Sequence, residues 1–282
     1  MTRRRRWQPA IATFVAMVGA LVFALPAFWM VTSALRPEGE IFSFLFPLSF
    51  HSIFPKTFTV ENFQLLMGSW GFARPVLNSL IVAAATTAFG LAFCAPAAFA
   101  LAVMRFPFRN TIFVLLFVSF SVPFDLVAIP LSSIFRGVGL ANTYPALILP
   151  GLGNGFAILL LRQFFMALPS QLQEAARVDG AGWWRILFEI YLPLARPALV
   201  AAGVTLFISQ WQAYLWPLLI SSQPQMQVGA VALASMKGGA LAVTNFGVIF
   251  AGAAVMAIIP AILMLAFQRT FVASIASRGS SG

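Results

Sequence analysis

Six long apolar runs dominate this sequence and constrain its fold more than any other feature. Each run exceeds the length of about 20 residues that a helix needs to cross the hydrocarbon core of a bilayer. Because the runs are of helix length, they predict an all-α polytopic membrane protein rather than a set of short alternating strands. The predicted transmembrane helices are Pro9–Leu35, Pro75–Val103, Thr111–Phe135, Tyr144–Met166, Ala198–Ser221 and Thr244–Gln268.

The composition points to lipid as the solvent of most of the chain. Of the 282 residues, 61% are hydrophobic and only 9% are charged. Soluble domains have about 45–50% apolar and about 25% charged residues. One soluble core could not bury this excess. We therefore expect a single transmembrane domain over residues 1–282 and no additional soluble domain.

The basic residues predict the orientation of the six helices. Lys and Arg number 17, and 12 of them fall at the termini, in gaps or near the end of an apolar run that six crossings place on the N-terminal side. Since loops rich in Lys and Arg stay in the cytoplasm, both termini are expected there. The net charge of +10 is divided among these gaps, so it does not indicate nucleic acid binding. The 12 residues are Arg3, Arg4, Arg5, Arg6, Arg105, Arg109, Arg162, Arg177, Arg185, Arg196, Arg269 and Arg278.

The residue types that carry most enzyme chemistry are scarce. Cys94 is the single cysteine and His51 the single histidine, so neither a disulfide nor a cysteine or histidine metal cluster is expected. The lysines are Lys56 and Lys237, and neither belongs to a phosphate-binding G-x-x-x-x-G-K-[ST] loop. We predict no catalytic residue, cofactor site or metal ligand in this chain. Any energy for uphill transport must then come from a partner or an ion gradient.

The longest predicted cytoplasmic gap, residues 167–197, is polar but has the pattern of two short helices. Pro169 and Ser170 are typical of a helix start, with Ser170 as a cap. A first helix is expected over Gln171–Val178 and is ended by Gly180. A second is expected over Ala181–Tyr191 and should end at Leu192-Pro193, because a residue before proline avoids the helical region.

The first of these helices is predicted to dock a soluble partner. Glu174 can accept a charge-assisted hydrogen bond, and the small Ala175 and Ala176 allow close approach of another backbone. The alternative is an interfacial helix pair that Trp183 and Trp184 anchor at the membrane boundary. The predicted docking residues are Glu174, Ala175, Ala176, Arg177, Asp179 and Gly180.

Two groups of polar residues inside the apolar runs are candidates for a solute pathway. Asp125 lies between Pro123 and Pro130, and a carboxylate at membrane depth should face a bundle interior or a water-filled gate. It could instead reach the external headgroup layer. The second group can hydrogen-bond and stack on a sugar, or can simply hold helices together. Its members are Gln210, Trp211, Gln212 and Tyr214.

The loop resembles the EAA motif of permease subunits of binding-protein-dependent ABC importers, EAA-x3-G-x9-I-x-L-P. Glu174-Ala175-Ala176, Gly180, Ile190 and Leu192-Pro193 match it at every position. Nearly the whole chain is similar to the carbohydrate-importer branch, in its shorter, MalG-like form. The similar segments are Ser33-Ala34-Leu35-Arg36, Asn78-Ser79, Arg105-Phe106-Pro107, Gly139-Leu140-Ala141-Asn142-Thr143, Trp216-Pro217 and Gln268-Arg269.

The resemblance implies a bacterial inner-membrane permease with cytoplasmic coupling helices that forms half of a solute pathway. It also implies three partners: a second permease, giving a heterodimer more readily than a homodimer, an ATPase dimer that holds ATP and Mg²⁺, and an extracytoplasmic solute-binding protein. The family's Trp-Asn-Asp/Glu is replaced here by Trp211-Gln212-Ala213, which removes a carboxylate near the pathway. A gradient-driven carrier for a small polar solute is the alternative function. Which sugar or polyol is carried stays open.

Overall fold

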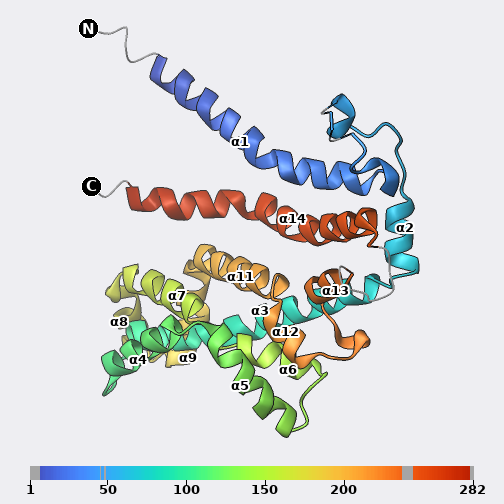
Figure 1. Ribbon diagram of the computed structural model, residues 1–282. Helices are drawn as coiled ribbons and strands as arrows, with labels where there is room; N and C mark the ends of the chain where they lie inside the picture. The colour runs from blue at the N-terminus through green and yellow to red at the C-terminus, as the bar shows by residue number, and fades with distance from the viewer. Residues whose placement is uncertain (1–6, 45, 48, 237–243, 280–282) are drawn as a thin grey trace. The chain divides into compact units, whose positions relative to one another are not determined.

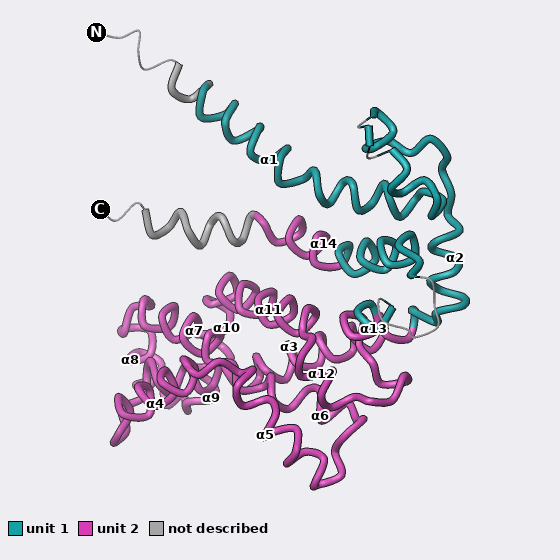
Figure 2. The backbone as a smooth tube through the Cα atoms, in the orientation of Figure 1, with its two compact units in different colours: residues 1–73, 233–258 teal, residues 74–232, 259–282 magenta. Residues whose placement is uncertain are grey.

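The computed structural model describes residues 7–44, 46–47, 49–236 and 244–279, and Figure 1 shows their helices. Arg3 to Arg6 and Lys237 of the orientation argument lie outside the described residues, and the side chains of residues 7–10 and 269–279 are likewise not described. The chain forms two compact units, residues 1–73 with 233–258, and residues 74–232 with 259–282 (Figure 2). The described residues are helices and their connections, as the all-α prediction requires.

The first unit joins a long apolar helix to a short irregular cap. α1 (Trp7–Ala34) is followed by the single turns η1 (Glu38–Glu40) and η2 (Phe50–Ser52) and by α2 (Glu61–Gly68). The initial part of α14 (Phe246–Gly279) belongs to the same unit. The cap contains short helical turns.

Buried polar groups hold the cap to the end of α1. Arg36 is fully buried and donates from Nη2 to the carbonyl of Ser52 at 3.1 Å. The amide of Asn62 donates to the carbonyls of Ala34 at 2.9 Å and Arg36 at 2.7 Å. Burial lowers the pKa of the Arg36 guanidinium from its usual value, and the charge of Glu40 partly opposes this shift. The bond from Asn62 to Ala34 satisfies a carbonyl that the end of α1 leaves without a helical partner.

The second unit contains most of the helices. It begins with α3 (Ala73–Val103), and three of its core helices are α7 (Gly155–Ala167), α8 (Ser170–Val178) and α11 (Arg196–Trp211). The remaining elements are α4 (Arg109–Ser121), α5 (Phe124–Gly137), α6 (Tyr144–Ile148), η3 (Leu149–Gly151), α9 (Trp183–Arg185), η4 (Ile186–Tyr191), α10 (Leu192–Leu194), α12 (Leu215–Ile220) and η5 (Pro224–Met226). α13 (Gly229–Ser235) spans the boundary between the units.

Three helices are long and apolar enough to cross a membrane alone: Ile11–Ala34, Ala73–Val103 and Phe246–Gln268. Three further crossings are possible if each of three bent helix pairs counts as one. Within these pairs the bend is 92° between α4 and α5, 43° between residues 144–151 and α7, and 83° between residues 183–194 and α11.

Three of the predicted continuous helices are interrupted. The range Tyr144–Met166 consists of α6 and η3, which end at Gly151, and of α7, which begins at Gly155. The range Thr111–Phe135 is two helices broken at Val122, where the following Pro123 disfavours helical backbone. The range Ala198–Ser221 is interrupted at residues 212–214, between α11 and α12. At the end of the chain, α14 continues past the predicted limit of Gln268 to Gly279.

A polar cluster fastens one end of the second unit. The amide of Asn78, fully buried in α3, donates to the carbonyls of Gln225 and Gln227, both at 2.8 Å. Its Oδ1 accepts a hydrogen bond from the hydroxyl of Tyr144 at 2.8 Å. Ser79 accepts from the backbone N–H of Gly229 at 2.8 Å. One asparagine thus connects three segments that are distant in the sequence.

Asn78→Ala should destabilise the protein by about 2–4 kcal/mol, because it leaves buried carbonyls without their donor. Tyr144→Phe removes only one of the three bonds, so it should cost about 1 kcal/mol. Thermal unfolding in detergent measures both changes. Equal losses in the two variants would contradict the central role of Asn78.

Candidate functional site

α8 is a short amphipathic helix whose inward face is set by one alanine. Ala176 is buried in the same core as residues of α3, α7 and α11. Glu174 and Ala175 are exposed, and Val178 exposes 88% of its surface. The predicted helix is therefore present, and it begins at Ser170. Of the predicted docking residues, however, only the exposed ones can contact a partner. Ala176 packs against the chain itself.

The connection after α8 depends on a left-handed residue. Gly180 has φ +76°, a conformation that L side chains rarely adopt. The N–H of Asp179 bonds to the carbonyl of Ala175 at 3.0 Å, and that of Ala181 to Ala176 at 2.9 Å. These bonds satisfy the last carbonyls of α8. The structure confirms the predicted end of the helix before Gly180.

At the beginning of α8, Pro169 occupies the cap position and no side chain caps the helix, so the prediction that Ser170 is the cap is wrong.

The second helical segment of the loop does not end where proline suggested. Helical turns run from Trp183 through Pro193 to Leu194, and the turns from Ile186 to Tyr191 are π-helical. These π-helical turns come directly before α10. Pro193 is an early residue of α10, a position where its missing N–H costs little. The segment then meets α11 at 83°.

Aromatic contacts hold this segment on the core. Phe99 of α3 lies edge-on to Tyr191 at 5.0 Å between ring centroids and to Trp183 at 6.2 Å. Phe165 of α7 lies 5.6 Å from Tyr191. Ile186 and Leu187 are buried in the same core. The loop is therefore packed as part of the bundle, an arrangement that periodicity alone did not predict.

The outer side of the loop carries charged side chains and the exposed, stacked rings of Trp184 and Phe188. The guanidinium of Arg177 stacks over the ring of Trp183 at 4.7 Å. Arg185 and Glu189 form an ion pair at 2.8 Å, and this hydrogen bond raises the pKa of Arg185. Trp184, predicted to be a membrane-boundary anchor, is 65% exposed.

The predicted pathway residues separate into exposed and structural groups. Asp125 is exposed in the first turn of α5, where the helix dipole favours a carboxylate. Gln212 and Tyr214 are exposed at the break between α11 and α12. Gln210 donates to the carbonyl of Leu147 at 3.2 Å, and Trp211 is buried.

Comparison with known proteins identifies the family. Residues 90–277 match the model of the family described as "Binding-protein-dependent transport system inner membrane component". The chain belongs to this family, which confirms the predicted resemblance and the predicted location in a bacterial inner membrane. It is a permease component of a transport system, and the comparisons favour this function over a gradient-driven carrier.

Relatives align along nearly the full length. The chain is 31% identical to the sn-glycerol-3-phosphate transport system permease protein UgpE of Yersinia pestis bv. Antiqua (strain Antiqua), over 96% of this chain and 97% of that protein. It is also 31% identical to the arabinooligosaccharides transport system permease protein AraQ of Halalkalibacterium halodurans, over 93% of both. A chain from a solved bacterial ABC transporter that imports alginate has the same fold, with a TM-score of 0.80 and 22% identity over 96% of this chain and 98% of that one.

Gly180→Ala should destabilise the loop by about 1–2 kcal/mol, because a Cβ opposes the left-handed backbone. Gly182→Ala is the matched control: Gly182 has φ −73°, and in both cases the added Cβ meets no atom within 4 Å. Its effect should be smaller, because alanine adopts this backbone and only the preference for glycine over alanine at the N-cap of α9 is lost. Limited proteolysis of the loop and thermal unfolding compare the two. The same loss in both would show that the left-handed backbone of Gly180 is not what makes its substitution costly.

Proposed function

We propose that the chain is one of two permease subunits of an ATP-driven importer of a sugar or related polyol, and that α8 couples it to an ATPase. The observation that carries this proposal is the exposed polar face of a short helix seated on the bundle core. Glu174 and Ala175 face outward while Ala176 anchors the helix. A soluble ATPase could press on such a helix without disturbing apolar surface.

The packing of the loop supplies a route for the coupling. A force on α8 reaches the loop core through Ala176 and the turn at Gly180. The core contains side chains of α3, α7 and α11, among them Phe99 and Phe165. Closely packed side chains transmit displacement because they leave little free volume. The helices that surround the solute would therefore move with α8.

The proposed complex contains three kinds of partner. ATP and Mg²⁺ would be held by an ATPase dimer, and a soluble binding protein would deliver the solute outside. A second, different permease would complete the pathway. α1 exposes large apolar side chains, including Phe23 at 86% and Leu21 at 70%, which lipid or this second permease must cover.

Chemistry at the exposed pathway positions fits a polyhydroxylated solute. Gln212 offers an amide to hydroxyl groups, and the ring of Tyr214 can stack on the apolar face of a sugar. The names of the relatives specify arabinooligosaccharides and sn-glycerol-3-phosphate, and all are polyhydroxylated solutes.

Glu174→Lys should abolish solute uptake while leaving the protein folded, because the reversed charge repels the arginine we expect on the ATPase. Co-purification of the ATPase and uptake into proteoliposomes measure the effect. The control is Glu189→Lys, the same charge change in the same loop at an exposed position. Normal uptake by the Glu174 variant, or equal loss in both variants, would argue against docking through α8.

Asp125→Asn should change the KM of uptake by about tenfold, since it removes a charged hydrogen-bond acceptor from the pathway. Association with the ATPase should be unaffected, because α5 and α8 are separate elements. An unchanged KM and rate would place Asp125 outside the pathway.

A further inference from the structure

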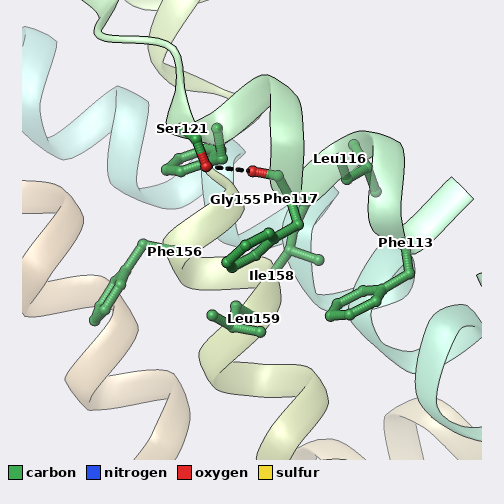
Figure 3. A pocket seen from close by; sticks show the side chains of 9 residues that line it. Phe113, Leu116, Phe117, Ser121, Gly155, Phe156, Ile158 and Leu159 are labelled. Atoms are coloured by element: carbon green, nitrogen blue, oxygen red, sulfur yellow. Dashed lines mark hydrogen bonds between the residues drawn. The ribbon is translucent and has the colours of Figure 1, made fainter.

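An apolar groove runs between α4 and α7 on the surface of the second unit (Figure 3). Its volume is about 250 Å³. Phe113, Leu116 and Phe117 of α4 line one wall, and Phe156 and Leu159 of α7 line the other. Among the described side chains of the second unit, none fills the groove: Phe117 is 56% exposed although its surroundings are apolar.

The groove is built into the contact between the two helices. A Cβ on Gly155 would lie 2.1 Å from the ring of Phe120, so glycine is required where α4 crosses the start of α7. α4, a helix described in full, has no buried residue. An apolar helix exposed on this scale needs a covering, and in a membrane protein the covering is lipid or another helix.

One end of the groove is strongly basic. A second hollow, lined by Arg105, Phe108, Arg109 and Thr111 among others, lies at the beginning of α4. Phe113 lines the apolar groove, and its ring supports the guanidinium of Arg162 at 3.9 Å. Arg162 in turn lies close enough to Arg109 of the second hollow for their charges to interact. Cation–π contact of this kind holds an arginine at the edge of an apolar surface.

The arginines at this end lack acidic partners. Arg109 donates to the carbonyl of Met104 and Arg162 to that of Leu101, both at 3.2 Å, and Arg105 is exposed. Along the described ranges, none of the three forms an ion pair. The charges of Arg109 and Arg162 repel each other. An anion bound here would relieve this repulsion, whereas the walls of the groove are apolar apart from Ser121, whose hydroxyl donates to the carbonyl of Phe117.

We propose that this groove binds an anionic phospholipid, with one acyl chain between α4 and α7 and the phosphate beside Arg105 and Arg109. Charge complementarity selects this occupant: a second permease helix would have to place acidic residues at one end of an otherwise apolar stretch. Basic pockets beside transmembrane helices on the cytoplasmic side bind anionic headgroups. The orientation predicted from the basic residues places this end of α4 at the cytoplasmic surface.

Photocrosslinking in nanodiscs tests the proposal with the full chain, in the complex in which it is purified. The discs contain phosphatidylcholine with a minority of phosphatidylglycerol, and benzoyl-phenylalanine replaces Phe117 in the groove or Val118 beside it on α4. Mass spectrometry identifies the lipid attached. Phe117 lines the groove, whereas the equally exposed Val118 does not, so the two positions are matched.

At position 117 phosphatidylglycerol should be enriched over its bulk fraction, and at position 118 it should not. The double variant R105Q/R109Q should reduce the enrichment by a factor on the order of 20, since each arginine near an anionic lipid contributes about fivefold. R105Q alone should lower it about fivefold and keeps the fold intact, because Arg105 is exposed.

The control pair K56Q/R74Q removes the same charge at exposed positions outside the groove, and it should leave the enrichment unchanged. Bulk lipid proportions at both labelled positions would overturn the proposal. So would crosslinks from position 117 only to polypeptide, which would assign the groove to a neighbouring subunit. Enrichment that survives R105Q/R109Q would also overturn it.

Discussion

The bilayer requires every backbone N–H and C=O at membrane depth to find a partner inside the protein, and the rest of this structure depends on that requirement. The breaks between helices show how the protein meets this requirement. At the break after α11, the N–H of Gln212 bonds to Ile208 at 3.0 Å and that of Ala213 to Gln210 at 3.3 Å. The side chain of Asn154 accepts from Ala157 at 3.0 Å and starts α7. Trp216 donates to the carbonyl of Ala146 at 2.9 Å.

The apolar runs were sufficient to predict the helical class and the three single helices that are long and apolar enough to cross a membrane, because hydropathy over a window reports which stretches prefer lipid. The bends were not predictable in this way, since averaging over a window removes the geometry of single residues. Pro123 marked the break between α4 and α5, but Pro26, Pro96 and Pro260 lie inside continuous helices. The contacts around a proline, which the sequence does not show, decide between these outcomes.

The loop of residues 167–197 also combines features that the sequence predicted with features that it could not predict. Its motif predicted α8 and the left-handed Gly180, because both follow from local backbone chemistry. The inward orientation of Ala176 and the aromatic contacts around Tyr191 depend on α3 and α7, whose residues are distant in the sequence. For the same reason Gln210 and Trp211 could not be separated from Gln212 and Tyr214 before the helices were placed. Whether a polar residue faces a pathway or a neighbouring helix is a tertiary property.

The 83° angle between residues 183–194 and α11 has a mechanical consequence. A displacement along the axis of the first segment is almost perpendicular to the second. It therefore exerts a torque on the base of α11 and tilts it, whereas a collinear arrangement would push the helix along its own axis. Small movements at the base of a tilting rod become larger at its far end, where the interruption at residues 212–214 lies.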